Sequence, residues 1–119
     1  MLNRLPRVLL HAEGAAVGAA AVALYFHGGY AWWLFVALVL APDLSMAGFL
    51  AGPAVGTMAY NTLHTYALPV VLGGVGAIVG ADIAVQLALI WLAHIGIDRA
   101  IGYGLKYPSG FKDTHLQRV

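Results

Sequence analysis

The stretch AVQLALIWLAHIGIDR, residues 84–99, starts as an apolar run and ends in His94, Asp98 and Arg99. An apolar run of this kind is typical of a helix inside a membrane. Ionisable side chains are costly there unless they reach the membrane surface or belong to a site. The rest of the sequence is needed to choose between these two interpretations.

Composition places the whole chain in a membrane. The chain has 119 residues, of which 61% are hydrophobic and 9% charged, whereas a soluble domain carries about 25% charged residues. We therefore expect membrane lipid as its surroundings. The net charge of +1 and the lack of a basic patch argue against a nucleic-acid partner. The lack of cysteine excludes disulfides and thiolate metal ligands.

Four hydrophobic segments, at about 6–26, 30–50, 53–79 and 81–101, are each long enough to cross the membrane. Short connections favour an all-α, antiparallel four-helix bundle forming a single domain over residues 1–119. We expect an interruption at Pro42–Met46 in the second segment and a kink at Pro69 in the third. The first segment contains His11 and Glu13 where a signal peptide would be apolar, so we expect it to be retained.

All six Lys and Arg residues lie at the two ends of the chain and none in the turns HGGY (27–30) and VGAD (79–82). The positive-inside rule therefore predicts that both termini, including the polar tail 102–119, are cytoplasmic. Helices this rich in Gly and Ala bury little area alone, so we also expect a homo-oligomer.

Polar residues from all four segments fall in the same, cytoplasmic half of this bundle. They are Glu13, Asp43, Asn61, His64, His94 and Asp98. Imidazole and carboxylate groups are suitable ligands for zinc, manganese or iron. We predict His64, His94 and Asp98 as metal ligands, with Glu13, Asp43 and Asn61 as catalytic groups.

Because the predicted site lies in one leaflet, a lipid or another amphiphile could enter it sideways, and a metal-dependent hydrolase is the leading functional hypothesis. Three alternatives remain open. The same groups could relay protons in a transporter subunit, or His64 and His94 could be axial ligands of a haem. Alternatively, the polar groups only fix helix packing, with Asp43 capping a helix and Glu13 paired with an arginine.

Two longer strings carry a family resemblance. YNTLHTY (60–66) and HIGIDRAIGYGLKYP (94–108) resemble a family of small bacterial integral membrane proteins known as domain of unknown function 4260. The resemblance implies a four-helix, multi-pass protein of the bacterial inner (cytoplasmic) membrane. It implies no activity, cofactor or catalytic residue.

The tail GYGLKYPSGFKDTHL, residues 102–116, leaves the membrane on the side of the predicted site. Its Gly and Pro residues favour a turn. One hypothesis is that it folds back as a basic lid, bringing Lys106, Lys112 and His115 over an anionic substrate. The alternative is a basic segment attracted to anionic lipid headgroups.

Overall fold

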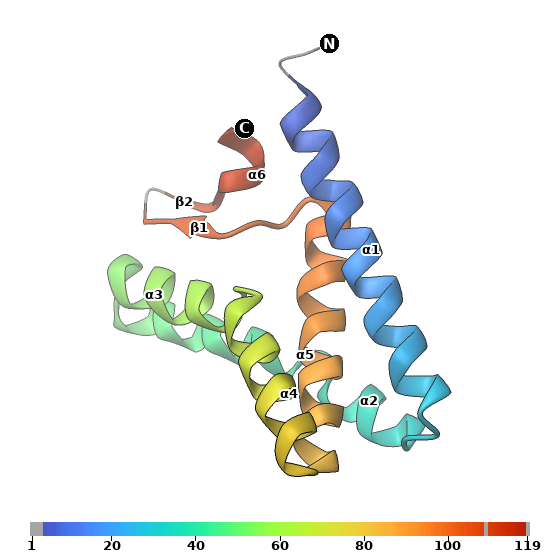
Figure 1. Cartoon of the computed structure of the whole chain (residues 1–119). Helices are drawn as coiled ribbons and strands as arrows, with labels where there is room; N and C mark the ends of the chain where they lie inside the picture. The colour runs from blue at the N-terminus through green and yellow to red at the C-terminus, as the bar shows by residue number, and fades with distance from the viewer. Residues whose placement is uncertain (1–3, 109, 119) are drawn as a thin grey trace.

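The computed structural model describes residues 4–108 and 110–118, which are mainly helical (Figure 1). In chain order the elements are α1 (Leu5–His27), α2 (Trp32–Leu38), η2 (Ala41–Ala51, a 3-10 helix), α3 (Pro53–Leu63), α4 (Ala67–Val79), α5 (Asp82–Ile101), β1 (Lys106–Tyr107), β2 (Gly110–Thr114) and α6 (His115–Arg118).

The predicted all-α fold with four membrane-length segments is confirmed. Among the described residues, four segments are long and apolar enough to cross a membrane: α1, α2 with η2, α3 with α4, and α5. The start of α1 and the short helix α6 lie at the same end of the molecule (Figure 1). Which side of a membrane that end faces stays a prediction.

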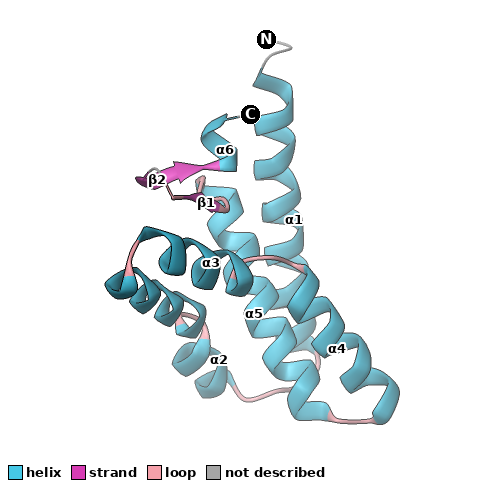
Figure 2. Cartoon of the chain, turned by 90° about the vertical axis from the view of Figure 1, so that its left-hand side faces the viewer, coloured by secondary structure: helices cyan, strands magenta, loops and turns pink. Residues whose placement is uncertain are grey.

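Helix α5 is the centre of the fold, with α1 and α4 packed against it (Figures 1 and 2). The contact with α1 is close because glycines face one another. A Cβ atom at Gly14 would lie 2.9 Å from the carbonyl oxygen of Gly96, and one at Gly18 would lie 3.2 Å from the nitrogen of Ile97. Small residues let two membrane helices approach in this way.

The second and third hydrophobic segments are both broken, and the two parts that adjoin in sequence, η2 and α3, form an arm. Elements η2 and α3 pack against each other and lean away from α1 and α5 (Figures 1 and 2). The predicted interruption around Pro42 is confirmed, since α2 ends at Leu38 and η2 follows from Ala41. We call η2 and α3, residues 41–63, the arm.

The predicted kink at Pro69 is misplaced, because the chain breaks between α3 and α4 at residues 64–66. In a continuous helix, the Pro69 ring would clash with the carbonyl of Thr65 and would give it no N–H donor. Helix α3 therefore ends before Thr65. Pro69 lies in the first turn of α4, where proline is tolerated.

The tail folds back onto the helices, where β1 contacts α3 and α6 contacts α1. Gly102 ends α5 with a φ of +107°, which favours glycine, and the chain turns there. Strands β1 and β2 then pair antiparallel, with Lys106 opposite Thr114. The resulting hairpin and α6 lie near the C-terminal end of α5 (Figure 2).

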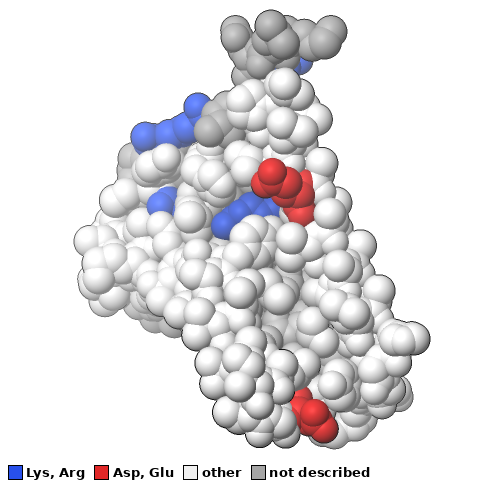
Figure 3. Space-filling view, in the orientation of Figure 1, with Lys and Arg blue, Asp and Glu red and all other residues white. Residues whose placement is uncertain are grey.

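Charge is unevenly spread over the surface. The face shown in Figure 3 is mostly uncharged, as a lipid-facing surface would be, and its basic side chains gather toward the end that carries the tail.

Candidate metal centre

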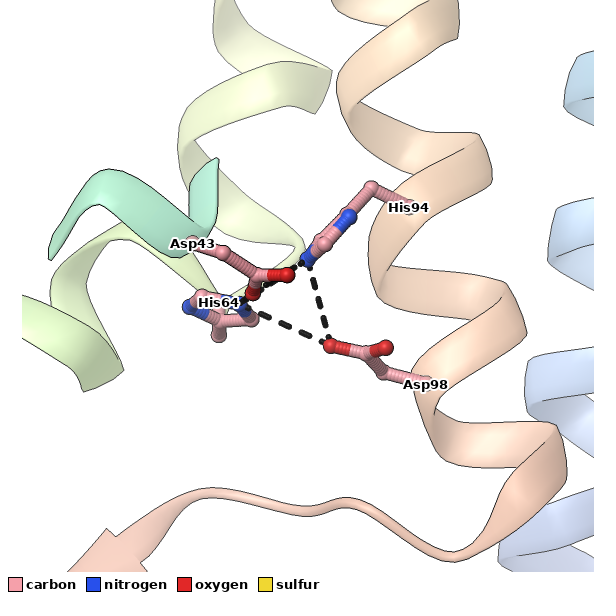
Figure 4. Close-up of side chains that lie close together, drawn as sticks. All are labelled: Asp43, His64, His94 and Asp98. Carbon is pink, nitrogen blue, oxygen red and sulfur yellow. Dashed lines mark hydrogen bonds and ion pairs between the residues drawn. The ribbon is translucent and has the colours of Figure 1, made fainter. Parts of the chain in front are cut away.

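Four side chains from three elements point at one place, where the arm meets α5 (Figure 4). Asp43 comes from η2, His64 from the end of α3, and His94 and Asp98 from successive turns of α5. One ligand atom from each lies within 4.8 Å of every other, so the group could hold a metal ion. The predicted convergence of these four polar groups is therefore found in the structure.

The distances within the group are short. The Nε2 atoms of His64 and His94 are 3.0 Å apart. Asp43 Oδ1 lies 3.2 Å from the first and 3.1 Å from the second. Asp98 Oδ2 lies 3.6 Å from His64 Nε2 and 3.2 Å from His94 Nε2.

Backbone carbonyls decide which ring nitrogens carry hydrogen. His64 Nδ1 lies 2.8 Å from the Tyr60 oxygen, and His94 Nδ1 lies 2.7 Å from the Val39 oxygen. A carbonyl can only accept, so each Nδ1 must be the donor. In the neutral rings both Nε2 atoms then present lone pairs to each other and to the two carboxylates. Such an arrangement is repulsive unless a cation, either a proton or a metal ion, lies among them.

Both carbonyls are available because the helices break nearby. Pro42 has no N–H, so in the 3-10 helix the carbonyl of Val39, three residues earlier, has no donor. At the end of α3 the His64 amide bonds to Asn61 instead of Tyr60. The Tyr60 oxygen is then left for the His64 side chain. The helix interruptions therefore orient both imidazoles.

The break after α3 is anchored by side chains of α5. Trp91 Nε1 donates to the Leu63 oxygen at 2.6 Å, and Arg99 donates to the His64 oxygen at 2.8 Å. Arg99 is only 5% exposed, so its charge lies inside the protein. Free carbonyls inside a membrane protein need such donors, and here they fix the backbone of a candidate ligand.

The centre is closed on its histidine side and open on its carboxylate side. The His64 side chain is fully buried, whereas the Asp43 side chain is 35% exposed. A pocket of about 240 Å³ begins at the carboxylates; its lining residues are Asp43, Met46, Tyr60, Asp98, Tyr103 and Lys106. A small molecule could therefore approach the centre from this side.

Two predicted catalytic residues lie outside the group. Glu13, which we expected to turn inward, is exposed on α1. The inward residue of that pair is His11, whose Nδ1 lies 2.9 Å from the Ala100 oxygen. An imidazole can satisfy this carbonyl near the end of α5, whereas a carboxylate has no hydrogen to donate. Asn61 is directed to the tail, where its amide binds the backbone of Lys106.

The three predicted lid residues have different positions. Lys106 lines the pocket. His115 is not part of the pocket lining, and its Nδ1 accepts a hydrogen bond from the Leu105 amide at 2.8 Å. The side chain of Lys112 lies outside the described part of the chain.

Three residues of the pocket lining, Tyr60, Tyr103 and Met46, were not among the predicted site residues. Tyr60 contacts a predicted metal ligand. Its ring stacks on His64 with a centroid distance of 3.7 Å. The spacing of four residues between Tyr60 and His64 places both on one helix face, and this signal could have identified it. Tyr103 and Met46 had no comparable signal.

The chain belongs to the family described as Domain of unknown function (DUF4260), whose model matches residues 7–119. This confirms the resemblance seen in the two longer strings. No curated protein and no solved structure matches the chain.

Proposed function

We propose that this chain is a membrane metalloprotein that binds one divalent ion through Asp43, His64, His94 and Asp98. The observation that carries the proposal is the spacing of the four donor atoms, which is 3.0–3.6 Å for the five pairs that include a histidine nitrogen. Ligands at 2.0–2.1 Å around a tetrahedral zinc ion lie about 3.3 Å apart. The group thus has the size of a metal coordination shell.

The orientation of the histidines supports a metal over a proton. Metal-bound histidines usually donate their second ring nitrogen to a carbonyl or carboxylate, and both histidines do so here. Nitrogen and oxygen donors suit zinc, manganese or iron. The geometry argues against a bis-histidine haem, because nitrogens on opposite sides of one ion would lie about 4 Å apart at such bond lengths.

We further propose that the metal serves hydrolysis of a lipid or another amphiphile. The pocket on the carboxylate side gives a substrate access to the ion. A bound metal lowers the pKa of a coordinated water and makes it a nucleophile. Asp43 is the more exposed carboxylate, so it is the ligand best placed to release the ion and accept a proton from that water.

Elemental analysis of the purified full chain tests metal binding. We expect a stoichiometric transition metal in the native protein and its loss in His64→Ala and His94→Ala. His27→Ala, at the exposed end of α1, is the matched control and should keep the metal. A native protein without metal, or histidine variants that retain it, would refute the proposal.

The oligomeric state, membrane and orientation of the protein are also proposals. We propose a homo-oligomer in the bacterial inner membrane with both termini cytoplasmic. The terminal basic residues support the orientation of the termini. Reporter fusions at each end should give a cytoplasmic signal, and cross-linking in native membranes should give multimers. A periplasmic signal or a monomer would contradict the corresponding part.

A further inference from the structure

The pocket beside the candidate metal centre contains a buried lysine. Lys106 is 3% exposed, and its Nζ lies 4.4 Å from the centre of the Tyr60 ring. Both residues line the pocket together with the two aspartates. An ammonium group has three N–H donors, so Lys106 can bind a ligand in addition to its contacts within the protein.

Asn61 fixes the position of Lys106. The Lys106 amide donates to Asn61 Oδ1 at 2.6 Å, and Asn61 Nδ2 donates to the Lys106 oxygen at 2.8 Å. Asn61 lies on α3 three residues before His64. The same helix end therefore holds a candidate metal ligand and the pocket lysine, which are distant in the sequence.

Tyr60 adds a neutral donor to the pocket. It is 2% exposed and lines the pocket. A phenol hydroxyl can donate one hydrogen bond, so Tyr60 can bind a ligand oxygen in the pocket.

The charges in the pocket favour an anion. The two positive charges of a divalent ion would balance the carboxylates of Asp43 and Asp98, and the pocket lining also contains the positively charged Lys106. Opposite charges attract strongly where water is scarce. Without the ion the same lining is net negative, so anion binding should require the metal.

We propose that this pocket binds the phosphate group of a membrane amphiphile, with phosphate oxygens directed to the metal, the Lys106 ammonium and the Tyr60 hydroxyl. The inference rests on the proposed metal centre. A phosphate has enough oxygens for all three groups, whereas a carboxylate has two. The pocket volume of about 240 Å³ is below the roughly 300–1,000 Å³ of typical ligand pockets, so it suits a headgroup and not a whole lipid.

Calorimetric titration of the purified full chain tests this inference, with metal content measured on every sample. The probes are inorganic phosphate, dihexanoyl phosphatidic acid and dihexanoyl phosphatidylcholine. We expect the first two to bind and the zwitterionic phosphatidylcholine to bind much more weakly. Tighter binding of phosphatidic acid than of inorganic phosphate would identify a lipid as the source of the group, and equal affinity would identify free phosphate and overturn the amphiphile part.

Substitutions then test the two donors. Lys106→Met should weaken phosphate binding by about tenfold or more, because a charge-assisted hydrogen bond is lost, and Lys106→Arg should restore most of it. Tyr60→Phe should weaken it by about fivefold, the effect of one neutral hydrogen bond. Arg118→Met removes a tail charge that lies over Tyr107, outside the pocket lining, and should leave the affinity unchanged.

The outcomes separate this inference from the proposed function. Unchanged phosphate affinity in Lys106→Met with full metal content would overturn the inference and leave the metal centre intact. Asn61→Leu provides a second variant, which should lose phosphate affinity and keep the metal. Phosphate binding that survives complete removal of the metal by chelator would also overturn the inference.

Discussion

Helix α5 contacts α1 and the arm by different means. Its contact with α1 is a close approach of backbones at Gly14, Gly18 and Gly96. Its contact with the arm, η2 and α3, is made through polar groups: the metal-binding group, Trp91 and Arg99. The first contact depends on shape alone, whereas the second depends on charge and, by our proposal, on a bound ion. A part of the molecule that is held by polar groups can respond to a ligand.

The largest expected effect comes from breaking the first contact. In Gly96→Leu the new side chain would overlap the backbone of α1 at Gly14 and Gly18. Overpacking of a core costs about 1–3 kcal/mol, and overlap with backbone should exceed this range. Detergent-denaturation curves measure the effect. Gly74→Leu, on α4 where a Cβ meets nothing within 4 Å, is the control, and equal losses in both variants would contradict the comparison.

Removal of the metal should act on the second contact. We expect faster amide hydrogen exchange across the arm, residues 41–63, and little change where α1 meets α5. A ligand present at 100 times its Kd contributes about 2.7 kcal/mol, so apparent stability should fall by about that amount. Hydrogen-exchange mass spectrometry of native and chelator-treated protein measures it. A uniform change along all helices would show that the arm is not held separately.

A smaller effect is expected from the anchors at the break after α3. Trp91→Phe leaves the Leu63 carbonyl without its donor and should cost about 1–3 kcal/mol, the range for an unsatisfied buried group. Thermal unfolding measures this cost. Trp32→Phe, at an exposed position, should be nearly neutral. A neutral Trp91→Phe would mean that the break is held by other contacts.

The smallest expected effect concerns pH and the tail. Burial lowers the pKa of His115, and the charge of Arg99 lowers it further. The unfolded chain therefore binds the proton more tightly, and the stabilising contribution of His115 is present above pH ~6.5 and is lost as the pH falls below it. Protonation removes the acceptor for the Leu105 amide.

Hydrogen exchange at Leu105, corrected for the intrinsic rate, should therefore increase between pH 7 and 5. The increase should be absent in His115→Gln, which does not titrate. Equal pH dependence in both proteins would exclude His115 as the cause.

Much of the fold could be predicted from hydropathy. Apolar length located all four membrane segments within a few residues of their observed bounds, and Pro42 marked a real interruption. Pro69 was misjudged because a proline disturbs the helical turn before it, so the break falls at residues 64–66. A proline in the sequence shows reliably that a helix is interrupted. It is less reliable in showing at which residues the break lies.

The sequence predicted that the two histidines and two aspartates of the candidate site lie together. It did not predict that Glu13 is exposed on α1. The spacing of four residues places His94 and Asp98 on one helix face. The positions of Asp43 and His64 within their segments predicted that both lie at the same depth in the membrane as this pair. Glu13 has that depth as well, but rotation about the α1 axis turns it outward, since the glycines of α1 must face α5. Depth follows from sequence position, whereas rotation depends on the partner helix.

By itself, the sequence determined the membrane character, the four spans and the residue types available for a metal. These follow from composition and spacing, which are properties of the chain before it folds. Only the tertiary structure decided that Val39 and Tyr60 carbonyls orient the two imidazoles, and that Asn61 brings Lys106 to the pocket. Backbone groups are present in every residue, so the sequence does not mark those that a broken helix leaves free for a distant side chain.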